Sequence, residues 1–135
     1  MAQQQFVYRE GATPEGKRWV LVRDAGQFPG VLRFHDFKLT TLSRIPGEQG
    51  HEAWERAREE VRHPLGEHDA QRLFNRRREL PADLRGLCLV FAGRTWKDRG
   101  GQLFVRTLEY YGEDWHLGFR WLGFGWSSYV RLVEA

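Results

Sequence analysis

Several short strings in the chain resemble parts of ligand-binding or catalytic motifs. The string GATPEGK, residues Gly11–Lys17, matches the first seven positions of a phosphate-binding loop. The eighth position should supply Ser or Thr for magnesium, but this chain has Arg18 there. The residues that follow read as a strand, whereas the motif needs the N-terminus of a helix. The string therefore predicts a hairpin turn and not a nucleotide site.

The histidines form no complete metal-binding motif. His51 begins the string HEAWE on a predicted helix, but the zinc motif requires a second His where this chain has Glu55. The string from His63 to His68 resembles an inverted zinc motif, yet it has one residue too many and contains Pro64. We therefore expect no metal and no cofactor.

The candidate nucleophiles also lack the context that catalysis requires. Ser127 precedes a predicted strand, whereas a nucleophile elbow joins a strand to a helix. Cys88 has apolar neighbours, which should raise its pKa and reduce its reactivity. The adjacent carboxylates Glu113 and Asp114 occupy a predicted turn. We expect a non-catalytic protein, with a small hydrolase or metal-dependent enzyme, built from residues distant in sequence, as the third alternative.

Two groups of residues remain as candidates for binding a partner. One is a basic cluster on the predicted second helix, although nearby acids could pair with it and leave only a solvated, ion-paired face. The other is an excess of aromatic residues in the predicted hairpins, including Tyr110 and Phe124. Trp, Tyr and Arg carry much of the binding energy at protein interfaces. The predicted partner-binding residues are Arg72, Arg76, Arg77, Arg78, Trp96, Tyr111 and Trp126.

Composition is consistent with one globular domain, residues 1–135. The chain has 21 basic and 18 acidic residues, a net charge of +3, which is a small excess for a dedicated nucleic-acid binder. A single Cys excludes an internal disulfide bond. The N-terminal residues do not read as a signal peptide, and no apolar run approaches the length of a membrane span. We expect a cytoplasmic location and no membrane contact.

Three regions of different composition must position these residues. Region 1–43 contains strand-like runs at Gln5–Glu10, Lys17–Asp24 and Val31–Leu39, of which the first two suggest a hairpin. Region 44–85 is a charged insert with nine Arg and nine acidic residues, predicted to form two helices. We expect this insert to contribute more to binding than to folding.

The helices of the insert follow from hydrophobic spacing. Ala53, Trp54, Ala57 and Val61 recur at helical intervals in a first helix that Pro64 ends. A second helix is predicted over about Glu67–Glu79, with the apolar residues Ala70, Leu73 and Phe74 on one side and Asp69 as a candidate cap.

Region 86–135 contains four strand-like runs separated by short turns and predicts an antiparallel β-meander. Its first run, Leu87–Ala92, is apolar on both faces and should lie centrally in the sheet. The predicted fold is α+β, a mostly antiparallel curled sheet or partial barrel of six to seven strands, with the two-helix insert between strands three and four.

These patterns favour a binding or regulatory protein that docks onto another macromolecule. A protein partner, for example one with an acidic surface, fits the small net charge and the Arg, Trp and Tyr content, as in a small inhibitor or adaptor. The alternative is a nucleic-acid-binding module that uses Arg on phosphates and exposed aromatic rings on bases.

Overall fold

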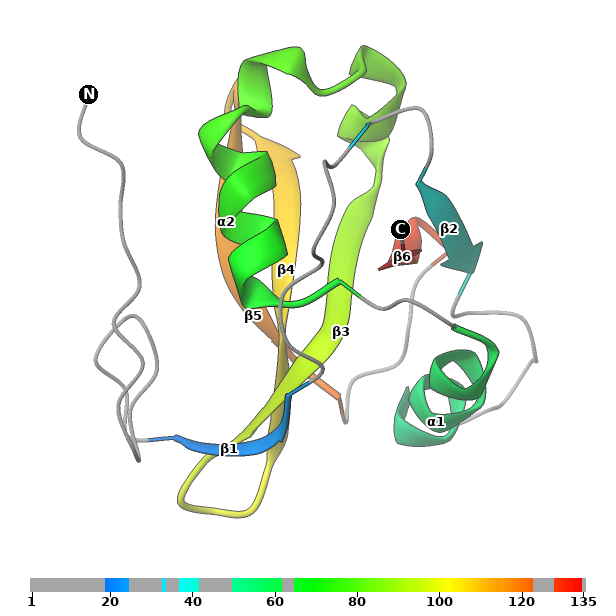
Figure 1. The fold of residues 1–135 in the computed structure, drawn as a ribbon, viewed down its shortest axis with the longest axis vertical. Coiled ribbons are helices and arrows are strands. Elements are labelled where there is room, and N and C mark those ends of the chain that lie inside the picture. Colours follow the sequence, from blue (N-terminus) through cyan, green and yellow to red (C-terminus); the bar gives the residue numbers. More distant parts are fainter. Residues whose placement is uncertain are drawn as a thin grey trace.

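The computed structural model describes residues 19–24, 33, 37–41, 50–61, 65–122 and 128–134 (Figure 1). Two α-helices and two short 3-10 helices accompany a mixed β-sheet. In chain order the elements are β1 (Val20–Asp24), β2 (Lys38–Thr41), α1 (Gly50–Glu60), α2 (Glu67–Asn75), η1 (Arg77–Glu79), η2 (Ala82–Gly86), β3 (Cys88–Lys97), β4 (Leu103–Tyr111), β5 (Asp114–Trp121) and β6 (Val130–Glu134).

Five strands form a continuous open path in the order β2-β6-β3-β4-β5. The β3–β4 and β4–β5 pairs are antiparallel hairpins, as predicted for the meander. Strand β6 instead crosses to the other edge of β3 and pairs with it in parallel, Cys88 opposite Val130. Strand β1 pairs with residues 94–97 at the other end of β3, on the edge that β6 also uses. It is not part of the five-strand path.

Strand β3 is central and buried on both faces, as its apolar sequence predicted. Nine of its ten residues are buried, from Cys88 to Trp96. Successive side chains of a strand point to opposite faces, so β3 requires an apolar layer on each side. Its even-numbered residues Cys88, Val90 and Ala92 lie in one hydrophobic cluster, and its odd-numbered residues Leu89 and Phe91 lie in another.

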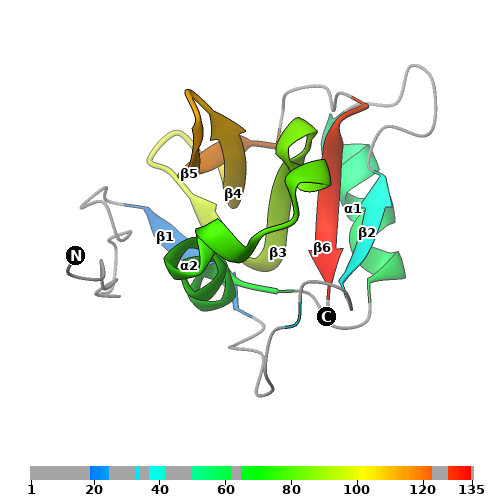
Figure 2. The same cartoon turned by 90° about the horizontal axis from the view of Figure 1, so that it is seen from above.

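Each helix of the insert covers one of these two clusters. Ala53, Trp54 and Val61, from α1 and the residue just after it, pack with the even-numbered face of β3. Ala70 and Leu73 of α2 pack with the odd-numbered face. Figure 2 shows the helices apart, with α2 beside β3 and α1 beside β2 and β6. The insert therefore contributes to folding through enclosed side chains, and its contribution to binding stays a prediction.

The start of α2 is fixed against the middle of β3. The Gly93 N–H donates to the Leu65 carbonyl at 2.9 Å, and the Gly66 N–H donates to Asp69 Oδ2 at 2.9 Å. A Cβ atom on Gly93 would lie only 2.7 Å from the Gly66 Cα, a distance that real Cβ contacts do not show. Glycine is needed here because two backbones touch. Asp69 thus stabilises the start of α2 from its third helical position, whereas the N-cap residue is Gly66 and not Asp69.

The observed sheet differs from the predicted one in its pairing. It is mixed, because β6 joins β3 in parallel, and five of its six described strands form the continuous path. It is not closed into a barrel, since β2 and β5 do not pair with each other in the described residues. In chain order the helices lie between β2 and β3, and β2 overlaps the third predicted strand. Strand β3, apolar on both faces, lies inside the sheet, with β4 on one edge and β1 and β6 on the other.

Several element boundaries also differ from the prediction. Strand β3 runs through Gly93 to Lys97, where we expected a turn, and α2 ends at Asn75 before the separate turn of η1. Of the predicted strand Val31–Leu39, only Lys38 and Leu39 coincide with β2; Arg33 and Phe37 are not in a strand, and the rest lies outside the described residues. The predicted strand Gln5–Glu10 and the loop Gly11–Lys17 also lie outside them. Within the described ranges, neither helix has the length and apolarity that crossing a bilayer requires.

Candidate functional site

The four predicted arginines do not form one helix face. Arg72 lies in α2, Arg76 at its C-terminal end, and Arg77 and Arg78 in η1. The chain changes direction at Arg76, whose backbone φ is −109° and ψ is 23°, so the side chains diverge. The prediction of a single basic surface on the second helix was therefore wrong.

Two of these arginines have carboxylate partners close in sequence. Arg72 Nη2 lies 2.6 Å from the fully buried Asp69 Oδ1, and Arg76 Nε lies 3.1 Å from Glu79 Oε2. The hydrogen bond to Arg76 lowers the pKa of Glu79, while the same bond raises the pKa of Arg76. Arg72 and Arg76 thus fit the alternative interpretation of the cluster, a solvated face of ion pairs. Their paired charges give little net attraction for a partner.

The other two arginines lie at a hollow of about 300 Å³ beside the β4–β5 turn. This volume is at the lower end of the range for small-ligand sites. We call it the arginine hollow, and it contains three guanidinium groups, two carboxylates and two aromatic rings. Its lining residues are Arg77, Arg78, Arg85, Tyr110, Glu113, Asp114 and Trp115.

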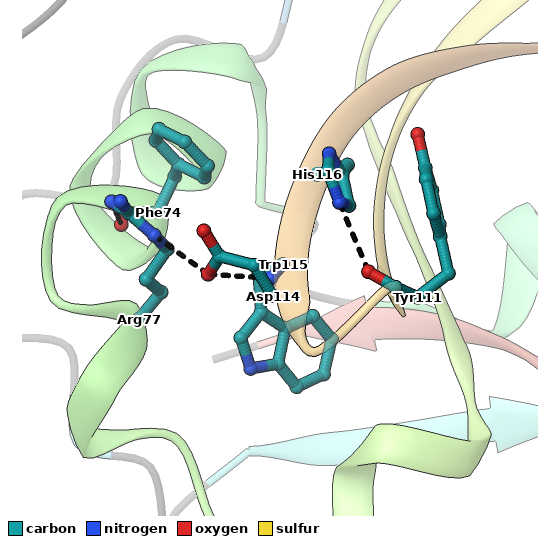
Figure 3. A network of polar contacts seen from close by, with 6 residues as sticks. All are labelled: Phe74, Arg77, Tyr111, Asp114, Trp115 and His116. Atoms are coloured by element: carbon teal, nitrogen blue, oxygen red, sulfur yellow. Dashed lines mark hydrogen bonds and ion pairs between the residues drawn. The ribbon is translucent and has the colours of Figure 1, made fainter.

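Arg77 is held in place by contacts from two elements (Figure 3). Its Nε donates to Asp114 Oδ1 at 3.0 Å, its Nη1 donates to the Phe74 carbonyl at 3.2 Å, and its guanidinium carbon lies 4.4 Å from the centre of the Phe74 ring. Asp114 Oδ1 also accepts from the Trp115 N–H at 2.8 Å. That backbone hydrogen bond, more than the Arg77 side chain, lowers the pKa of Asp114. Arg77 therefore joins η1 to β5 and is already occupied.

Arg78 and Arg85 differ from Arg77 because both are exposed. Arg85 lies over the Tyr110 ring, with 4.7 Å between the guanidinium carbon and the ring centre. Tyr110 in turn makes an edge contact with Trp115, the ring centres 5.5 Å apart. Within the part of the chain that the structure describes, neither Arg78 nor Arg85 has a carboxylate partner. Their positive charges remain available at the mouth of the hollow.

The β4–β5 hairpin also carries an exposed aromatic ring, Tyr111, on the face opposite Tyr110 and Trp115. Gly112 and Glu113 both have positive φ, 59° and 68°, as a tight two-residue hairpin turn requires. Tyr111 is 59% exposed and stacks on His116 with ring centres 3.8 Å apart. The His116 ring nitrogen Nε2 lies 3.0 Å from the Tyr111 carbonyl oxygen (Figure 3). Tyr111 was predicted as a partner-binding residue, and its exposure is compatible with that role.

Trp96, in contrast, lies in the interior. Its side chain is 2% exposed, and its Nε1–H donates to the carboxylate of Glu67 at the start of α2. Glu67 and Arg106 are both fully buried, with 4.0 Å between their nearest charged atoms. A ring in this position cannot contact a partner without unfolding, so we exclude Trp96 from the candidate surface. Trp126 and Phe124 lie outside the described residues.

The remaining candidates for catalysis do not assemble in the described residues. Burial raises the pKa of Cys88 to about 12, so its thiol stays protonated at neutral pH, as its apolar neighbours predicted. Among the described His, Cys, Asp and Glu side chains, no group of three is close enough to hold a metal ion. Ser127 and His63 fall outside these ranges.

Sequence reasoning identified Arg77 and Arg78 but missed Arg85 and Asp114. Asp114 was interpreted as a turn residue only, and Arg85 as one more charge in the insert. Thirty-seven positions separate Arg77 from Asp114, so no local spacing could have predicted their contact. Tyr110 was noted only as one of several hairpin aromatics. In comparisons with known proteins, no family model, no curated protein and no solved structure matches this chain.

Proposed function

We propose that this chain is a non-catalytic binding protein that docks onto another protein through the arginine hollow, at the end of the β4–β5 hairpin that also carries the exposed Tyr111, in the manner of a small inhibitor or adaptor. The observation that carries the proposal is the presence of two exposed arginines, Arg78 and Arg85, at the same hollow without a carboxylate partner in the described residues. Arginine and aromatic side chains are enriched at the centres of protein interfaces.

The mixed charge of the hollow favours a protein partner over nucleic acid. Glu113 and Asp114 lie in the same lining as the three arginines. A continuous phosphate backbone would pass close to both carboxylates and be repelled by them, whereas a protein surface presents single charges at separate points. The small net charge of the whole chain, +3, supports the same choice.

The test compares two variants with the same change in charge. Arg85→Glu reverses a charge at the hollow, and Arg99→Glu reverses one in the β3–β4 turn, at the opposite end of β4 (Figure 1). Each variant and the wild type would be used to isolate cross-linked partners from native cell extract, with and without nuclease. We expect a protein partner that survives nuclease, is retained by Arg99→Glu and is lost with Arg85→Glu.

Two results would contradict this proposal. A partner that disappears after nuclease treatment would assign the surface to nucleic acid. Equal recovery by Arg85→Glu and the wild type would place the docking site elsewhere. Thermal melts of both variants serve as the control for folding, because an exposed substitution away from buried groups should change stability by about 0.5 kcal/mol or less.

A further inference from the structure

We propose that the ligand of the arginine hollow is a carboxylate side chain, supplied by an acidic segment of the partner. This inference deepens the proposed function and rests on it. It assigns the chemical group that the hollow recognises and the residues that recognise it, Arg78 and Arg85 with the half-buried ring of Tyr110.

The charge of the lining suits a single negative charge. Three guanidinium groups and two carboxylates leave the hollow with a net charge of +1 at neutral pH. Asp114 and Arg77 already neutralise each other at 3.0 Å. Beyond that pair, Arg78 and Arg85 share the lining with one carboxylate, Glu113. A monoanionic carboxylate balances the remaining charge, whereas a phosphate monoester, with a charge of about −1.5 to −2 at neutral pH, exceeds it.

The geometry of Arg85 suits a planar acceptor. Its guanidinium group is placed over the Tyr110 ring at 4.7 Å, which limits the orientations that the group can adopt. A restricted guanidinium group can donate two parallel hydrogen bonds to the two oxygens of one carboxylate, and little further ordering is required when the ligand enters. Arg78 is exposed at the same mouth and adds a second positive charge.

The aromatic residues supply the apolar part of the site. Tyr110 and Trp115 pack edge to face and both line the hollow. The half-buried Tyr110 ring can contact the methylene groups of a glutamate side chain while its carboxylate meets the guanidinium groups, and the buried Trp115 ring supports Tyr110 from the interior. The existing Arg77–Asp114 contact shows the same arrangement inside the protein, a carboxylate held by an arginine that lies against an aromatic ring.

The experiment uses capped hexapeptides whose four central residues are all Glu, all Gln or all phosphoserine. Binding to the full chain would be followed by the NMR signals of the Trp indole N–H groups. Trp115 lines the hollow and reports on it, while the buried Trp96, hydrogen-bonded to Glu67, is an internal control. Each peptide would be titrated into the wild type, Arg85→Gln, Arg85→Lys and Arg99→Gln.

We expect the Glu peptide to shift the Trp115 signal in a saturable way and to leave that of Trp96 unchanged. The Gln peptide should bind the wild type about tenfold more weakly, or weaker still, than the Glu peptide does. The Glu peptide should lose a similar factor on Arg85→Gln, since each change removes about one charge-assisted hydrogen-bonded pair. Arg85→Lys keeps the charge but loses the planar fork, and should give an intermediate affinity. Arg99→Gln should bind as the wild type does.

The proposal is overturned if the Glu and Gln peptides bind equally, or if Arg99→Gln weakens binding as much as Arg85→Gln. A phosphoserine peptide that binds more than about tenfold tighter than the Glu peptide would reassign the hollow to phosphate. If the peptides fail here but Arg85→Glu still loses the native partner, only the carboxylate assignment falls. If both experiments fail, the proposed function falls as well.

Discussion

At the scale of single residues, the contact between Trp96 and Glu67 explains why one predicted binding residue became a structural one. A tryptophan near a predicted turn has the same sequence appearance whether its ring is exposed or enclosed. Here β3 continues to Lys97, which carries Trp96 into the interior beside the start of α2. Its indole N–H then satisfies a fully buried carboxylate, a group that is costly to bury without donors.

Trp96→Phe should therefore destabilise the protein through a lost hydrogen bond. Phenylalanine retains an aromatic ring but has no N–H to donate to Glu67. We expect the free energy of unfolding to fall by roughly 1–3 kcal/mol, measured by urea denaturation. The loss should be smaller in a Glu67→Gln background, since a neutral amide is less costly to leave with fewer partners. If the two substitutions add without coupling, the contact has no energetic role.

At the scale of elements, the sequence predicted the type of most helices and strands but not all of their ends. The helical spacing of Ala53, Trp54 and Val61 correctly identified the buried side of α1. Gly93, in contrast, was interpreted as a turn residue, although it lies inside β3. Glycine allows both a turn and a close backbone approach, and only the position of Gly66 distinguishes the two.

Gly93→Ala should test this interpretation, with Gly86→Ala as the matched control. The new methyl group at residue 93 would meet backbone atoms of Leu65 and Gly66 at 2.7–2.9 Å, so α2 and β3 must move apart. We expect a loss of about 1–3 kcal/mol in unfolding free energy. At Gly86 no atom lies within 4 Å of the added carbon, and the change should be within about 0.5 kcal/mol. Equal melting temperatures for the two variants would contradict the close-approach argument.

The candidate site shows a different limit of sequence reasoning. The arginine hollow is assembled from η1, the end of η2 and the β4–β5 hairpin. Local patterns identified the arginines as a group, but they placed Arg72 and Arg76 together with Arg77 and Arg78. Which arginines have carboxylate partners depends on how the chain turns after α2, and that turn left no clear pattern in the sequence.

At the scale of the whole molecule, the helical insert and the sheet form one folding unit. Trp54 of α1 is 1% exposed and packs among residues of β3, β4 and β6. The high charge of region 44–85 hid this role, because its charged residues outnumber the few that are enclosed. The insert cannot be removed without exposing both faces of the central strand.

Trp54→Ala should consequently have a large effect on stability. Removing an enclosed tryptophan leaves a cavity and typically reduces the free energy of unfolding by about 3–5 kcal/mol, a large part of the stability of a domain of this size. Tyr129→Ala is the control, since that ring is 42% exposed. Calorimetric melts that give the same midpoint for both variants would show that α1 is not part of the core.

The position of β6 has a consequence for the order in which the chain folds during its synthesis. Strand β2 lies next to β6 and to no other described strand, with Thr41 opposite Arg131. A ribosome releases β2 early, and β2 must then remain without its neighbour while the helices and both hairpins emerge. Strand β2 joins the sheet only after β6 has paired with both β2 and β3. Long sequence separations of this kind slow folding, because the loop must close before the contact forms.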